Sequence, residues 1–113
     1  MVSISQSGGF KMEKFDKQKI NHELYECLAK IDSAKDFKEL LADLCTPSEV
    51  EQMAQRLLCA KLLLKGYTYS QIIEITDISS ATLSRVSRCI KYGSGGYAEI
   101  VGKMVAGGEN EKD

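Results

Sequence analysis

A run of nineteen residues from Ser79 to Tyr97 contains three basic side chains and no acidic one. The basic residues are Arg85, Arg88 and Lys91. Such cations bind phosphate oxygens, and the planar guanidinium group of arginine also binds the O6 and N7 atoms of guanine. Charge alone does not distinguish a nucleic-acid surface from an ordinary solvated helix face. The run is therefore a candidate binding segment whose meaning depends on the elements that carry it.

The chain as a whole shows no comparable excess of charge. Its 113 residues include 15 Lys plus Arg and 16 Asp plus Glu, which gives a formal net charge of −1. This charge excludes a protein whose whole surface is basic and binds nucleic acid non-specifically, but it does not exclude a localised basic face. The hydrophobic content of 43% and the charged content of 27% are typical of a folded globular protein. This length predicts a single domain.

A short helix is predicted immediately before the basic run. Thr68 and Gln71 have the spacing of a capping box, so the helix should begin at these residues. Ile72, Ile73 and Ile75 are expected to point into the core of the protein. Residues 76–78 then break the helical pattern and predict a turn of about three residues.

The basic run lies on a second predicted helix, which Ser79 should cap. At about 100° per residue, Leu83 and Val86 lie on one side of this helix and the two arginines lie on the other. Two helices joined by such a turn have the layout of a helix-turn-helix, whose second helix enters the major groove of DNA. The candidate DNA-binding residues are Thr68, Tyr69, Ser70, Gln71, Ser79, Ser80, Ala81, Thr82, Ser84, Arg85, Arg88 and Lys91.

Four further helical segments surround this motif. Apolar residues at spacings of three and four predict helices over residues 17–31, 33–45, 46–66 and 97–105. The fold class is therefore all-α, with about six helices. The helix over residues 46–66 has an apolar arc that is too broad for one neighbouring face, which predicts a second copy of the chain as its cover.

The ends of the chain differ in composition from this helical body. Residues 1–11 are predicted to be a disordered extension, residues 12–106 the helical domain, and residues 107–113 a disordered acidic tail. The sequence contains no run of about 18 apolar residues and no basic-then-apolar start, so no contact with a membrane is expected. A cytoplasmic location is predicted.

Enzymatic and metal-binding functions find little support in the sequence. Ser84 and Cys89 have no histidine nearby, because the single histidine is His22 in the first predicted helix. The four cysteines are separated by 18, 14 and 30 residues, which does not match the spacing of a zinc site. Each falls in or beside an apolar stripe and is predicted to be a small buried side chain. We therefore predict a protein that is not an enzyme and holds no metal.

Several stretches resemble the bacterial tryptophan repressor, namely TPSE at 46–49, AQR at 54–56, LLKG at 63–66 and ATLSR at 81–85. The run SRVSRCIKYGSGGY at 84–97 is similar to the YerC/YecD family of Trp-repressor-like proteins. The resemblance covers roughly residues 17–100. It implies an intertwined homodimer whose paired helix-turn-helix motifs contact successive major grooves of a two-fold symmetric operator. It also implies repression of transcription.

The resemblance further implies a candidate effector site. In the tryptophan repressor the co-repressor lies between two arginines, which match Arg56 and Arg85, and near a helix cap, which matches Thr46. The repressor has a glycine after the second arginine, whereas this chain has Val86. We therefore expect the protein itself to fill part of that pocket, and predict that no cofactor is needed. The alternative to an effector-binding role for Arg56 is that it forms an ion pair on the protein surface.

Two functions follow from these observations. The first is sequence-specific binding of double-stranded DNA by a transcriptional regulator. The alternative is a protein-interaction adaptor in a transcription complex that uses the same fold without direct DNA readout. Single-stranded nucleic acid is disfavoured, because aromatic residues make up only 7% of the chain and form no stacking stripe.

Overall fold

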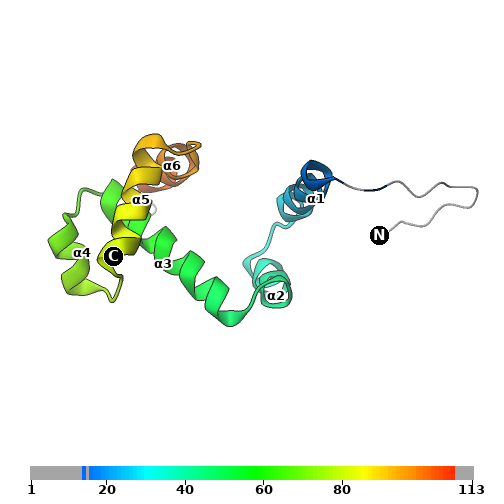
Figure 1. The fold of residues 1–113 in the computed structure, drawn as a ribbon, viewed down its shortest axis with the longest axis horizontal. Coiled ribbons are helices and arrows are strands. Elements are labelled where there is room, and N and C mark those ends of the chain that lie inside the picture. The colour runs from blue at the N-terminus through cyan, green and yellow to red at the C-terminus, as the bar shows by residue number, and fades with distance from the viewer. Residues whose placement is uncertain (1–13, 15, 109–113) are drawn as a thin grey trace, which may run out of the picture. The chain divides into compact units, whose positions relative to one another are not determined.

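Helices make up nearly all of the regular structure in the computed structural model, which describes residues 14 and 16–108 (Figure 1). In that part of the chain there are six α-helices, one π-helical segment and no strand. The predicted all-α class is confirmed, while the disorder predicted for residues 1–11 lies outside the described residues. The elements are α1 Lys17–Ala29, α2 Ala34–Leu44, α3 Pro47–Leu64, α4 Tyr69–Ile75, α5 Ser80–Tyr92, η1 Gly96–Val101 and α6 Gly102–Ala106.

Contacts divide the chain into two units, residues 1–41 and residues 42–113. In the first unit, helix α1 begins where Asp16 accepts a hydrogen bond of 2.9 Å from the Lys19 amide. Helix α2 begins where the Ser33 hydroxyl accepts one of 3.1 Å from the Asp36 amide. Among the described residues of this unit none is buried. The unit therefore has helix caps but no apolar core of its own.

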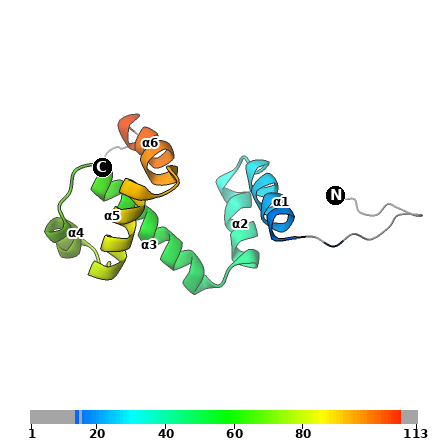
Figure 2. The same cartoon turned by 45° about the horizontal axis from the view of Figure 1, so that its top comes forward.

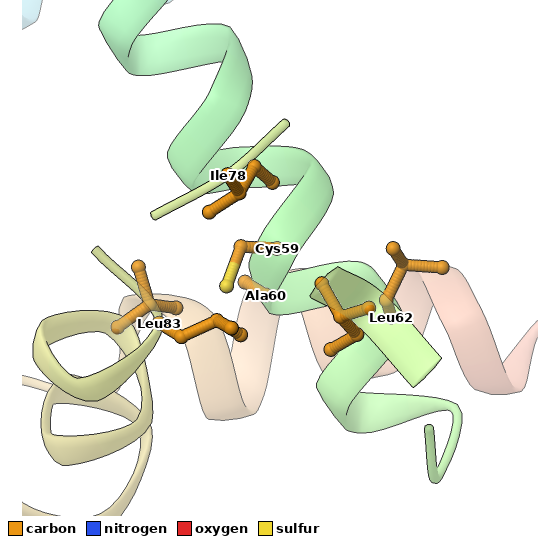
Figure 3. Packing of buried hydrophobic residues seen from close by; sticks show 7 residues of the cluster. Cys59, Ala60, Leu62, Ile78 and Leu83 are labelled. Carbon is orange, nitrogen blue, oxygen red and sulfur yellow. The ribbon is translucent and has the colours of Figure 1, made fainter. Parts of the chain in front are cut away.

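The second unit contains a core built around α3. Figure 3 shows Cys59 and Ala60 of α3 among side chains that come from the helix-turn-helix segment. Close packing of such apolar side chains removes them from water and is the main favourable term in folding. The buried cluster consists of Cys59, Ala60, Leu62, Ile72, Ile78, Leu83 and Val86.

Local hydrogen bonds set both ends of α3. The Thr46 hydroxyl accepts a bond of 3.1 Å from the Glu49 amide, and the Glu49 carboxylate accepts one of 2.8 Å from the Thr46 amide. This is the capping box predicted from sequence. At the other end Gly66 has a φ of 99°, which places it in the left-handed region that glycine adopts without strain. Its amide and that of Tyr67 donate to Leu63 and Leu62, as in a Schellman motif.

The chain after α5 continues into η1 and α6, which pack beside α3 (Figure 2). A Cβ atom at Gly93 would lie 2.4 Å from the carbonyl oxygen of Cys89, so only glycine fits at the C-terminal end of α5. The predicted last helix is present, but it starts as a π-helix, in which the Gly102 amide donates to the carbonyl of Tyr97 five residues earlier. Val101 is buried at the junction of the two segments.

Three side chains predicted to be buried are exposed instead. Ile73 and Ile75 are 47% and 59% exposed, because α4 has only seven residues and directs Ile72 alone into the core. Of the four cysteines, all predicted to be buried, Cys59 is buried, Cys45 and Cys89 are half-buried, and Cys27 is exposed on α1. The four cysteines are free thiols. None of the described helices is long and apolar enough to cross a bilayer.

Candidate nucleic-acid interface

Helix α4 begins at a second capping box. The Thr68 hydroxyl accepts a bond of 3.1 Å from the Gln71 amide, and the Gln71 side-chain oxygen accepts one of 2.8 Å from the Thr68 amide. Thr68, Tyr69, Ser70 and Gln71 are all exposed at this start of α4. The predicted residues therefore lie together in the first turn. The side-chain NH2 group of Gln71 is not used by the capping box and can donate hydrogen bonds to a ligand.

Thr76 shapes the turn between the two helices. Its hydroxyl donates a bond of 2.7 Å to the Ile72 carbonyl and accepts one of 3.2 Å from the Ile78 amide. The second bond places Ile78, which is only 5% exposed, in the core between α4 and α5. The turn was predicted over residues 76–78, but the two hydrogen bonds of the Thr76 hydroxyl were not. A threonine just after a short helix, with the next apolar residue two positions later, is the available signal for such a turn.

Helix α5 separates its two faces as its sequence predicts. Leu83 and Val86 are fully buried against the core of the second unit. On the other face every predicted residue of α5 is exposed except Thr82, which is half-buried. Helices α4 and α5 both pack on α3 and on each other, so this motif is held by the core rather than by loops (Figure 1). The exposed residues of this face and of the helix cap are Ser79, Ser80, Ala81, Ser84, Arg85, Arg88 and Lys91.

The start of α5 is fixed by two hydroxyl groups. The Ser79 hydroxyl accepts a bond of 3.1 Å from the Thr82 amide and donates one of 3.0 Å to the Thr82 hydroxyl oxygen. This cap confirms the predicted helix start. It also engages both side chains with each other, which limits their freedom to act as independent ligand contacts.

The basic side chains of α5 are not neutralised within the described chain. One ion pair, Lys35 to Glu39 at 2.8 Å, and one contact of the His22 imidazole with the Glu26 carboxylate at 3.1 Å are found there, both on the first unit. Arg85, Arg88 and Lys91 take part in none. Their positive charge is therefore available to an external anion, and a row of phosphates along a duplex provides such anions at regular intervals.

The residues of the candidate effector site occupy different environments. Thr46 is exposed and its hydroxyl caps α3, Arg56 is half-buried on α3, and Arg85 is exposed on α5. Arg56 forms no ion pair among the described residues, so the alternative of a surface ion pair gains no support. Val86 is fully buried, as its place on the helix predicts.

A pocket of about 430 Å³ lies elsewhere, between the end of α5 and the π-helical segment. Neither Arg56 nor Arg85 lines it, and its wall is mainly apolar. Its lining residues are Cys89, Gly93, Ser94, Gly96, Tyr97, Ile100 and Val101.

Two capped helices joined by a short turn, with a buried face and an exposed basic face, define the class of helix-turn-helix proteins. Comparison with known families then identifies the chain more closely. The family model described as Trp repressor protein matches residues 19–105, and the chain belongs to the Trp repressor family.

Two relatives agree with this assignment. The chain is 44% identical over 78 residues to the uncharacterized protein YerC of Bacillus subtilis strain 168, covering 66% of this chain and 75% of that protein. It is also similar to the crystal structure of a candidate Trp repressor from Staphylococcus aureus, with a TM-score of 0.71 and 33% identity over 75% of this chain and 85% of the other. The chain is thus a YerC-type member with the Trp-repressor-like fold. Family and fold suggest a DNA-binding regulator rather than an enzyme.

Proposed function

We propose that this protein is a homodimeric transcriptional repressor of the cytoplasm that binds a specific duplex DNA sequence through its helix-turn-helix. The observation that carries this proposal is the outward face of α5. Three exposed basic side chains lie there, no acidic residue occurs between Ser79 and Tyr97, and none of the three has an ion-pair partner among the described residues. An unpaired basic face on a capped helix matches the charge and width of the major groove.

The two helices have different roles in this proposal. Helix α5 lies in the major groove, with Arg85 near the base edges and Arg88 and Lys91 near phosphates. The start of α4 lies against the backbone, where the exposed Ser70 and Gln71 donate to phosphate oxygens. Since the core of the second unit holds both helices, their spacing is set before DNA binds.

A second copy of the chain completes the binding unit. The described residues of the first unit include apolar stripes on α1 and α2 but no buried residue. On α3, Met53 and Leu57 are also exposed, at 37% and 43%. Burying such stripes in a second copy stabilises a dimer through the hydrophobic effect. A dimer presents two copies of α5, so its operator has two half-sites about one helical turn apart.

Selection of bound duplexes from a random library tests the proposal. We expect a two-fold symmetric sequence to be enriched. Arg85→Ala and Arg88→Ala should each weaken binding, and loss of a phosphate contact should lower the slope of log affinity against log salt by about one unit. Lys103→Ala, which removes the same charge from α6, provides the matched control and should leave the slope unchanged. Absence of binding to any duplex at low salt would contradict the proposal.

Repression follows from the family resemblance and from the size of the chain. A small dimer that covers its operator has little surface left for recruiting polymerase. Placing the selected operator across a promoter in a purified transcription assay should lower transcript yield as the protein is added. An increase in yield would show activation instead.

The exposed Ile73 and Ile75 of α4 favour a second candidate function, an adaptor that binds another protein. Contact with a phosphate backbone does not require such apolar groups, whereas protein interfaces use them. The duplex selection described above separates the two functions, because an adaptor without DNA readout enriches no particular sequence.

We also propose that tryptophan is not required as a co-repressor. Support comes from Val86, which is fully buried beside Arg85 where the tryptophan repressor has glycine. Calorimetric titration with tryptophan should give no saturable heat. One site per subunit would show that Val86 leaves room for the ligand.

A further inference from the structure

The first turn of the exposed face of α5 carries one exposed apolar side chain, Ala81, and the far end of the same face carries Tyr92. Successive residues of a helix are rotated by about 100°, so Ala81, Arg85 and Arg88 form a single row along the outward face. All three are exposed, whereas Leu83 and Val86 on the opposite face are fully buried. The row therefore runs from a methyl group at the start of the helix to two guanidinium groups further along.

Three hydroxyl groups surround this methyl group at the helix start, and two of them are engaged with each other. Ser79 and Thr82 are hydrogen-bonded to each other at 3.0 Å, and Thr82 is half-buried. Ala81 lies between them in sequence and is exposed. In the major groove the apolar group that a base pair presents is the 5-methyl group of thymine.

We propose that the methyl group of Ala81 reads the 5-methyl group of a thymine in each half-site, close to a guanine bound by Arg85. This inference rests on the proposed function, which places α5 in the major groove, and adds the chemistry that α5 recognises. Four residues of helix span about 6 Å, and successive base pairs are about 3.4 Å apart. The thymine is therefore expected within about two base steps of the guanine.

Uracil substitution tests the inference directly. In the duplex selected from the random library, each thymine is replaced in turn by deoxyuridine, which lacks only the 5-methyl group. One thymine per half-site should show a loss of about fourfold in affinity, the effect of one buried methyl-sized group. Replacement at the other thymines should have little effect.

Variants of α5 assign the effect to Ala81. Ala81→Gly should bind the thymine and uracil duplexes equally. Ala98→Gly is the matched control, because it makes the same substitution at an exposed position of η1 outside the helix-turn-helix, and it should keep the preference for thymine. Ala81→Ser, which sets a polar hydroxyl against the methyl group, is a second variant expected to reduce the preference.

Two results overturn the inference while leaving the proposed function intact. One is tight binding with equal affinity for thymine and uracil at every position. The other is a thymine preference that survives unchanged in both Ala81→Gly and Ala81→Ser. A protein that binds no duplex at all overturns the proposed function and this inference together.

Discussion

The two units of this small protein differ in where their apolar side chains lie. Every residue of the buried cluster belongs to the second unit, residues 42–113, together with the buried Val101. The described residues of the first unit, residues 1–41, have apolar stripes of similar spacing but none is buried. The sequence pattern alone does not reveal this difference, because an amphipathic stripe looks the same whether its cover is the same chain or another one.

The difference matters for function. The helix-turn-helix is held by its own core, so the geometry of α4 and α5 does not depend on a second copy. Helices α1 and α2 need a cover, and the proposed dimer provides it. In the proposed dimer, the second unit reads DNA and the first unit determines how many reading helices are present. The following predictions test that division.

Removing a core side chain of the second unit should have the largest effect. Leu83 is fully buried on α5. Leu83→Ala deletes three carbon atoms and leaves a cavity, so the free energy of unfolding should fall by about 2–5 kcal/mol. Urea unfolding at a fixed protein concentration measures the change. A loss below about 1 kcal/mol would show that the packing around Leu83 is less tight than the structure indicates.

The same deletion in the first unit should act on assembly instead. Leu24 is 41% exposed on α1 in the single chain. If a second copy covers it, Leu24→Ala removes buried area from both copies and should weaken the dimer by about 2 kcal/mol, roughly thirtyfold in the dissociation constant. Light scattering over a dilution series gives this constant. An unmodified protein that is monomeric at micromolar concentration would refute the dimer.

The turn between α4 and α5 should show an intermediate effect on stability. Thr76→Val keeps the shape of the side chain and removes the hydroxyl that bonds to Ile72 and Ile78. The Ile78 amide then loses its partner, so the free energy of unfolding should fall by about 1–2 kcal/mol. Ser84→Ala on the exposed face of α5 is the control and should change it by less than about 0.5 kcal/mol. Equal effects of the two substitutions would show that the Thr76 hydroxyl does not hold the turn.

Helix starts were the most predictable part of this structure. Thr46, Thr68 and Ser79 cap their helices through bonds to residues three positions later, so the signal is contained in four consecutive residues. The division of α5 into a buried and an exposed face was predictable for a similar reason, since thirteen residues give several turns of consistent pattern.

Features that depend on distant contacts were not predictable in this way. The seven residues of α4 contain too few turns to define a face, and the packing against α3 and α5 decides that Ile72 is buried while Ile73 is not. The π-helical start of the last helix has no local sequence signal comparable to a cap. The environment of Arg56 likewise depends on which helices pack beside α3.

The smallest expected effect concerns the cysteines of the two units. Burial raises the pKa of the Cys59 thiol above its ordinary value of 9.0, because the charged thiolate is poorly solvated there. Since the thiolate is the reactive form, iodoacetamide should modify Cys59 more slowly than the exposed Cys27.

The raised pKa of Cys59 also means that the folded state holds the thiol proton more tightly than the unfolded state does. The stabilisation from Cys59 is therefore complete below pH 9.0 and is lost as the pH rises above that value. Urea unfolding at pH 7 and at about pH 10 should show a larger loss of stability for the unmodified protein than for Cys59→Ala. An equal loss in both proteins, or modification of Cys59 as fast as of Cys27, would mean that the core of the second unit is open to solvent like the surface of the first.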